Sequence, residues 1–173
     1  LDLGGTSFLR RVLGSNPAGL VRGGELLGDP IGGAKAEDLV ALVTKTCERF
    51  DLDPPDALRA FGKFMFPQLS ARFPVFVEGH DAKSFLKSVH DVIHVEVRKL
   101  FPEAVTPSFQ YVDDGPDTLT IRYTSPRKLC FVMEGLLAGV AAHYDVSIGV
   151  EHRTCMHDGA DACEFGLSFA RAA

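Results

Sequence analysis

The sequence predicts an α+β domain, in which a helical N-terminal half precedes a four-stranded antiparallel sheet crossed by one helix. The hydrophobic period is close to 3.6 residues between residues 36 and 101, as in helices, and changes to 2 after residue 108, as in half-buried strands. The length of 173 residues, with 46 % hydrophobic and 24 % charged residues, is typical of one globular domain. We therefore expect a single domain over 1–173, with a divergent, glycine-rich segment (1–35), a helical part (36–105) and a sheet part (106–173).

Proline positions divide the N-terminal half into successive helices. Pro54 and Pro55 suit the first turn of a helix, whereas Pro67 and Pro102 are expected to end one. Cys47 lies on an apolar helical stripe and is expected to be a core residue. The expected helices cover Thr6–Leu13, Ala36–Phe50, Asp56–Met65, Gln68–Phe73 and Asp81–Phe101.

The C-terminal half alternates as strands do. Leu119, Ile121 and Tyr123 are expected to face inward, between polar neighbours that face outward. Turn residues over 113–116 predict that 109–113 pairs with this strand as a hairpin. A helix is expected over Lys128–His143, and two further strands follow, with the alternating residues Val146, Ile148, Val150 and then Phe165, Leu167, Phe169.

Charge and hydropathy exclude several classes of function. The net charge of −5 and the pI near 5.6 argue against binding to nucleic acid phosphates. The longest uncharged apolar run is far shorter than the roughly 20 residues that span a bilayer. No basic start followed by an apolar stretch resembles a secretion signal, so we expect a cytoplasmic protein that contacts neither nucleic acid nor membrane.

His94 is the first candidate for chemistry. Leu86, Val97 and Phe101 share its side of the predicted helix. One interpretation is a core histidine that binds a backbone carbonyl. The other is an axial haem ligand, because a neutral imidazole offers iron a nitrogen lone pair and a helix holds it in place.

A Tyr-x-Ser-x-Arg sequence lies at the end of a predicted strand. An extended chain would point Tyr123, Ser125 and Arg127 to the same side. Two hydroxyls and a guanidinium that converge can bind a carboxylate or a phosphate. The alternative is a strand end followed by a proline turn and a surface arginine.

Taken together, these residues resemble the H-NOX (haem nitric oxide/oxygen binding) family. Its members carry a haem-ligating histidine, a proline after it and a Tyr-x-Ser-x-Arg motif. Here Pro107 follows His94 by 13 residues and Tyr123 follows it by 29, as in the family pattern. The stretches Ala57–Gly62 and Phe73–Pro74 also look like the helical half of the family.

The resemblance implies a haem b cofactor. His94 would ligate the iron, Pro107 would press on the porphyrin, and Tyr123, Ser125 and Arg127 would hold the propionates. This favours the ligand interpretation of His94 over the core interpretation. In the family, nitric oxide weakens or breaks the iron–histidine bond, and the helix that carries the histidine would then shift relative to the sheet.

The gas and the partner also follow from the resemblance. Oxygen-binding members carry a distal tyrosine nine residues after the motif tyrosine, and this position is Val132, which cannot donate a hydrogen bond. Nitric oxide is therefore favoured over dioxygen. The chain shows no output domain, so the signal would pass to a separate protein, in bacterial relatives a histidine kinase or a cyclic-di-GMP enzyme.

A second constellation contains three cysteines and a histidine. Cys130, His152, Cys155 and Cys163 could form a closed tetrahedral zinc site, with Gly159 allowing the turn that returns the last of them. A Cys155–Cys163 disulfide and free thiols are the alternatives, and His157 is a rival ligand. The zinc-containing bacterial subset of H-NOX domains has matching intervals.

The expected function is a haem-based nitric oxide sensor with a structural or redox-responsive zinc site. The alternative is a haem-free zinc/thiol redox sensor of the same fold. A zinc hydrolase is disfavoured because three cysteines and one histidine leave no open coordination position. No nucleophile elbow or phosphate-binding glycine loop is present, so we expect no enzymatic activity.

Overall fold

The computed structural model describes residues 43, 45–100, 102 and 104–172. The chain divides into two compact units, Leu1–Ala60 and Phe61–Ala173. The second unit contains every residue that the sequence analysis selected for chemistry.

In the first unit, residues 43 and 45–50 are helical. Cys47 on this helix is buried, which confirms its expected place in a core. The predicted helix Thr6–Leu13 and residues 36–42 of the next predicted helix lie outside the described residues. Within the part that the structure describes, no helix has both the length and the apolar character needed to cross a membrane.

Helix α4 (Pro54–Arg72) is continuous and contains Pro67. The prediction of two separate helices, 56–65 and 68–73, was therefore wrong. Proline inside a helix removes a hydrogen-bond donor and crowds the preceding turn. Packing offsets this cost, because the neighbouring Phe66 is buried and its ring meets that of Phe85 at 5.6 Å.

The predicted helix 81–101 is present but interrupted. It consists of α5 (Ala82–Ser88), a π-helical turn (Val89–Ile93) and α6 (His94–Leu100). Asp81 begins it through a capping box, in which its carboxylate accepts from Ser84 N–H and its own N–H donates to the Ser84 hydroxyl. The N–H of His94 donates to the Val89 carbonyl five residues back, which closes the π turn. Such turns often occur at functional sites, and this one ends at the predicted iron ligand.

The four predicted strands form an antiparallel sheet in the order β1-β2-β4-β3. Their bounds are β1 (Ser108–Gly115), β2 (Thr118–Thr124), β3 (Val146–Thr154) and β4 (Cys163–Arg171). The predicted alternation on β2 is confirmed, since Leu119, Ile121 and Tyr123 are buried while Thr118 and Arg122 are exposed. Val150 near the middle of β3 is exposed, although the predicted alternation placed it with the inward-facing residues Val146 and Ile148.

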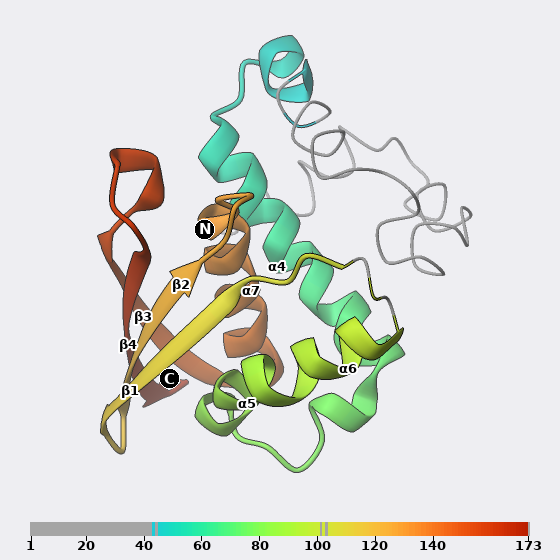
Figure 1. Ribbon diagram of the computed structural model, residues 1–173, viewed down its shortest axis with the longest axis vertical. Coiled ribbons are helices and arrows are strands. Elements are labelled where there is room, and N and C mark those ends of the chain that lie inside the picture. Colours follow the sequence, from blue (N-terminus) through green and yellow to red (C-terminus); the bar gives the residue numbers. More distant parts are fainter. Residues whose placement is uncertain (1–42, 44, 101, 103, 173) are drawn as a thin grey trace. The chain divides into compact units, whose positions relative to one another are not determined.

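Helix α7 (Cys130–His143) covers one face of the sheet (Figure 1). Its residues Met133, Leu137 and Val140 share one apolar core with the inward residues of β2 and β4. The helix begins two residues later than predicted, because Lys128 has a left-handed backbone conformation (φ 47°). The α+β architecture expected from the sequence is thus confirmed.

Two lysines attach α5 to the hairpin of β1 and β2. Lys83 and Lys87, one turn apart, both bind the carboxylate of Asp113, and Lys83 also binds the Gly115 carbonyl. Hydrogen bonds from the two lysines lower the pKa of Asp113 to about 2. The carboxylate therefore stays ionised at neutral pH and keeps the start of the 82–100 helical segment beside the sheet.

Gly62 allows α4 and α7 to approach closely. A Cβ atom at this position would lie 2.2 Å from the Val132 carbonyl oxygen and 2.9 Å from the Leu136 nitrogen. Both atoms belong to the backbone, so neither can rotate away. We expect Gly62→Ala to destabilise the protein by about 1–3 kcal/mol, the usual cost of overpacking.

Thermal unfolding followed by circular dichroism measures this effect. A loss of 1 kcal/mol lowers the Tm by about 2–4 °C in a protein of this size. The control is Lys63→Ala, at the next position on the same helix, where the side chain is exposed and the expected change is within about 0.5 kcal/mol. Equal Tm values for the two variants would contradict the close approach of the helices.

Candidate functional site

His94 begins α6 and lies against an aromatic residue of β1. Its ring stacks on that of Phe109 at 5.4 Å and meets that of His90 at 6.4 Å. Burial, aided by His90 and Arg98, lowers the pKa of His94 to about 4, so the imidazole is neutral at pH 7. Its Nδ1 atom is buried and has no hydrogen-bond partner among the described residues. A neutral, desolvated imidazole with one unpartnered nitrogen is able to ligate a metal.

Pro107 lies between α6 and β1. Hydrogen bonding between its backbone carbonyl and the His94 imidazole opposes the lowering of that pKa. The structure therefore brings these two predicted residues together. The sequence pattern gave no role to the neighbouring His90. It is half-buried, and its Nδ1 accepts from the N–H of Phe109 at 3.4 Å.

The Tyr-x-Ser-x-Arg motif does not continue as an extended chain. Strand β2 ends at Thr124, and the N–H of Lys128 donates to the Ser125 carbonyl, which closes a turn with Pro126 at its second position. The expectation of an extended chain through all three motif residues was therefore wrong. Proline has no N–H to give to a neighbouring strand, so the turn is favoured over the extended form.

The turn still holds the motif's polar groups near the end of β2. Tyr123 and Ser125 are only 3 % and 4 % exposed. The Tyr123 hydroxyl accepts from Leu129 N–H at 3.1 Å, and the Ser125 hydroxyl accepts from Arg127 N–H at 3.2 Å. Burial raises the pKa of Tyr123, so it remains a hydrogen-bond donor at neutral pH. Within the described residues no carboxylate binds the half-buried Arg127 guanidinium, which leaves it able to bind a ligand carboxylate.

Phe109 connects the two parts of the site. It pairs with Tyr123 in the β1–β2 register, and their rings lie 5.7 Å apart. The same ring stacks on His94. Sequence reasoning placed Phe109 in a strand but gave it no role, because its contact with His94 is made between two elements.

Val132, which the family resemblance suggested as a position that affects the choice of gas, lies on α7. It is buried at 8 % exposure and has no hydrogen-bond donor in its side chain. The position therefore adds apolar surface to the interior of the unit.

Four residues form a second site, which we call the Cys3His cluster. Cys130 begins α7, His152 lies on β3, Cys155 follows β3, and Cys163 begins β4. One potential ligand atom from each lies within 4.8 Å of all the others. The Cys130 and Cys155 sulfurs are 3.8 Å apart, and tetrahedral zinc with bonds of about 2.3 Å requires about this spacing.

The three sulfurs of the cluster are unbonded, at least half-buried and, in two cases, contacted by backbone N–H groups. All four cysteines of the chain are unbonded, so the Cys155–Cys163 disulfide is not formed. Backbone N–H groups of Met156 and His157 donate to Cys163 and Cys155 at 3.2 and 3.4 Å. Burial raises the pKa values of the Cys130 and Cys163 thiols, and the charge of the Cys155 sulfur adds to both shifts. A divalent cation would offset the repulsion between three thiolates.

The histidine of the cluster has one nitrogen free for a metal. His152 Nε2 is buried and has no partner among the described residues, whereas Nδ1 lies 2.7 Å from Glu134 Oε1. The register of β3 with β4 shifts between His152 and Thr154, so Arg153 is an extra residue in β3. The rival ligand His157 is engaged elsewhere, since its Nε2 donates to the Lys128 carbonyl at 2.8 Å. Gly159 takes the left-handed conformation (φ 92°) that the predicted turn requires.

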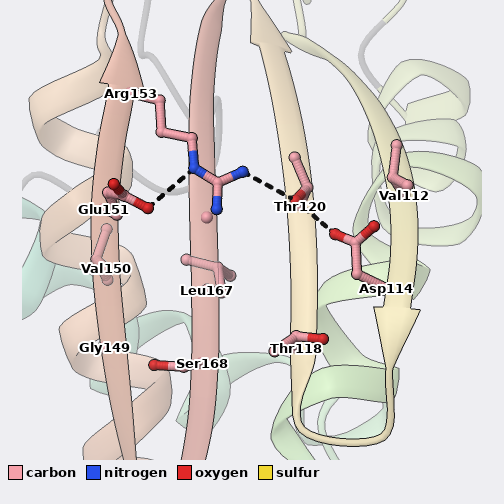
Figure 2. A pocket seen from close by; sticks show the side chains of 11 residues that line it. Val112, Asp114, Thr118, Thr120, Gly149, Val150, Glu151, Arg153, Leu167 and Ser168 are labelled. Carbon is pink, nitrogen blue, oxygen red and sulfur yellow. Dashed lines mark hydrogen bonds and ion pairs between the residues drawn. The ribbon is translucent and has the colours of Figure 1, made fainter.

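An open groove of about 900 Å³ lies on the sheet face away from α7 (Figure 2). Arg153 crosses it and binds Glu151 at 2.9 Å, Thr120 at 3.5 Å and Glu164 at 3.5 Å. Its guanidinium is thus already engaged by side chains of the sheet. None of the predicted site residues lines this groove, so we do not place the functional site there.

Comparison with known proteins identifies the family and the fold. Residues 29–152 match the family model described as Haem-NO-binding (HNOB). The crystal structure of an H-NOX protein from S. oneidensis in the Fe(II)NO ligation state is 30 % identical, with 96 % of this chain and 98 % of that chain covered and a TM-score of 0.80. The NMR structure of the Shewanella oneidensis SO2144 H-NOX domain in the Fe(II)CO ligation state is also 30 % identical. The match covers 96 % of this chain and 97 % of that chain, with a TM-score of 0.78.

A more distant structure supports the fold alone. The crystal structure of the Fe(II) unliganded H-NOX protein from K. algicida is 23 % identical to this chain. The match covers 79 % of this chain and 74 % of that chain, with a TM-score of 0.73. No protein of curated function matches the chain significantly. The family match and the 30 % identity over nearly the whole chain lead to one conclusion: this chain belongs to the H-NOX family, whose haem domains bind gases as sensors and are not enzymes.

Proposed function

We propose that this chain senses nitric oxide at a five-coordinate ferrous haem b, with His94 as the iron ligand. When bound, ferrous haem supplies an iron atom whose open sixth position takes a diatomic gas. The observation that carries the proposal is the neutral, half-buried His94 imidazole, whose buried Nδ1 atom has no partner among the described residues. Tyr123, Ser125 and Arg127 would bind the propionates, and Pro107 would lie against the porphyrin.

Selectivity for nitric oxide is supported by Val132. Bound dioxygen carries partial negative charge and gains from a hydrogen-bond donor, which a valine side chain does not offer. Nitric oxide binds ferrous haem without such a donor. The buried Val132 therefore favours nitric oxide over dioxygen.

Visible spectra of the reduced, haem-reconstituted protein test this proposal. We expect the Soret band of the ferrous protein to shift when nitric oxide is added. The band should not shift when the ferrous protein is mixed with air-saturated buffer. A stable oxygen complex would contradict the selectivity, and a featureless spectrum after reconstitution would contradict the sensor itself.

We also propose that the Cys3His cluster holds zinc. The 3.8 Å sulfur spacing, the unpartnered His152 Nε2 and the N–H groups directed at two sulfurs support this assignment. Such a closed site would connect α7, β3 and β4 and stabilise this end of the sheet.

A thiol redox sensor is the second candidate function, and the position of Cys155 favours it. Cys155 is half-buried and lines a groove of about 410 Å³, whereas Cys130 and Cys163 are fully buried. Peroxide could oxidise Cys155 and Cys130 to a disulfide, with the peroxide reduced to two waters after uptake of two protons, and zinc would leave. Zinc release by peroxide from a protein that never shows a Soret band would support this haem-free alternative.

The signal would pass to a separate protein, which we propose is a histidine kinase or a cyclic-di-GMP enzyme. His94 is the first residue of α6, so a change at its imidazole acts directly on this helix. The proposal predicts that the nitric oxide-loaded protein alters autophosphorylation or cyclic-di-GMP turnover of such a partner, and that the gas-free protein alters it differently.

A further inference from the structure

We infer that Glu134 is a positioning residue of the Cys3His cluster, which holds the His152 imidazole so that Nε2 faces the three sulfurs. This inference rests on the proposed metal site and assigns a role to a residue outside the four ligands. Metal-bound histidines usually donate their other ring N–H to a carboxylate or a carbonyl, and this bond fixes the tautomer and the ring orientation.

The hydrogen bond determines which nitrogen carries the proton. The distance between Glu134 Oε1 and His152 Nδ1 is 2.7 Å, within the range of charge-assisted hydrogen bonds. An ionised carboxylate can only accept, so Nδ1 must be the protonated nitrogen. In the neutral ring Nε2 then has the lone pair, and it is this buried atom that has no partner among the described residues.

The hydrogen bond between His152 and Glu134 is largely shielded from water, which could otherwise replace either partner. The His152 and Glu134 side chains are only 16 % and 15 % exposed. The imidazole lies 4.2 Å from the ring of Phe165, with interplanar angle 30°, and 6.4 Å from that of Phe131. These rings limit the tilt of the imidazole, and the carboxylate is the group that distinguishes its two nitrogens.

Glu134 and Cys130 lie four residues apart on α7, so they share one face of the helix. One helical turn thus supplies both a sulfur ligand and the carboxylate that orients the ligand from β3. The negative carboxylate would also make the imidazole more basic and strengthen its bond to a metal.

Zinc affinity of the full-length protein, kept reduced and measured by competition with a chromophoric chelator, tests the inference. We expect Glu134→Ala to weaken zinc binding about 10- to 100-fold, the usual effect of losing such a partner. Glu134→Gln keeps an acceptor oxygen but loses the charge, so its zinc affinity should fall less than that of Glu134→Ala. The control is Glu151→Gln, next to His152 in sequence but with a side chain that is 72 % exposed. It should leave the affinity unchanged.

Nitrogen-15 NMR of the histidines adds a readout that a general loss of stability would not change. In the wild type, with and without zinc, we expect His152 to carry its proton on Nδ1. In Glu134→Ala without zinc the two tautomers should become mixed, and the Nδ1 proton should exchange faster with water. Wild-type affinity and an unchanged tautomer in Glu134→Ala would overturn the inference and leave the zinc proposal intact. If the wild type binds no zinc but its tautomer depends on Glu134, the orientation of His152 stands and the proposed metal site fails.

Discussion

The His94→Gly variant is expected to lose nearly all of its haem during purification, and free imidazole is expected to restore it. His94 offers the imidazole nitrogen that we propose ligates the iron, and glycine leaves a cavity of the size of that ring. Soret absorbance relative to protein concentration measures the loss. Imidazole added during haem reconstitution should recover the band, because the free ligand can occupy the vacated position.

Two controls separate loss of the ligand from loss of the fold. His80→Gly removes an exposed histidine outside the helices and should retain haem without imidazole. The zinc content of His94→Gly should equal that of the wild type, since the Cys3His cluster is built from other elements. Full haem retention in His94→Gly without imidazole would refute the assignment of the ligand.

The second large effect is expected at the Cys3His cluster. Cys155→Ala or Cys163→Ala should lower bound zinc below one equivalent, because three remaining ligands no longer close a tetrahedral site. Structural zinc sites contribute about 10–16 kcal/mol of apparent binding free energy at pH 7, which is also folding free energy. The variants should therefore unfold at a clearly lower temperature than the zinc-loaded wild type.

Cys47→Ala is the matched control for these two variants. It truncates a buried cysteine that is not part of the cluster, so it should cost stability without changing the zinc content. Zinc measured by mass spectrometry of the reduced protein distinguishes the two effects. One full equivalent in both Cys155→Ala and Cys163→Ala would reject the proposed ligand set.

Local sequence patterns were sufficient for much of the fold. The alternation of Leu119, Ile121 and Tyr123 predicted the inward face of β2, and Asp81 was the predicted start of the helix that leads to His94. Such patterns depend on neighbours within a few residues, which is the range over which helix caps and strand faces are determined. The cysteine intervals likewise selected the four residues that the structure brings together.

Pro67 and the π turn before His94 show where local rules fail. A proline normally ends a helix, but contacts of Phe66 with residues far along the chain keep α4 continuous. The extra residue of the π turn has no signature in the hydrophobic pattern, which continues through it.

The sequence alone determined the fold class, the family resemblance and the residues most capable of binding haem and zinc, because these depend on residue type and spacing. Tertiary structure alone decided which groups support them. Phe109 against His94 and Glu134 against His152 are contacts between separate elements, and no local pattern specifies such pairs. Packing first excludes water from the imidazole. A neighbouring carboxylate or aromatic ring then determines which imidazole nitrogen is left for a metal.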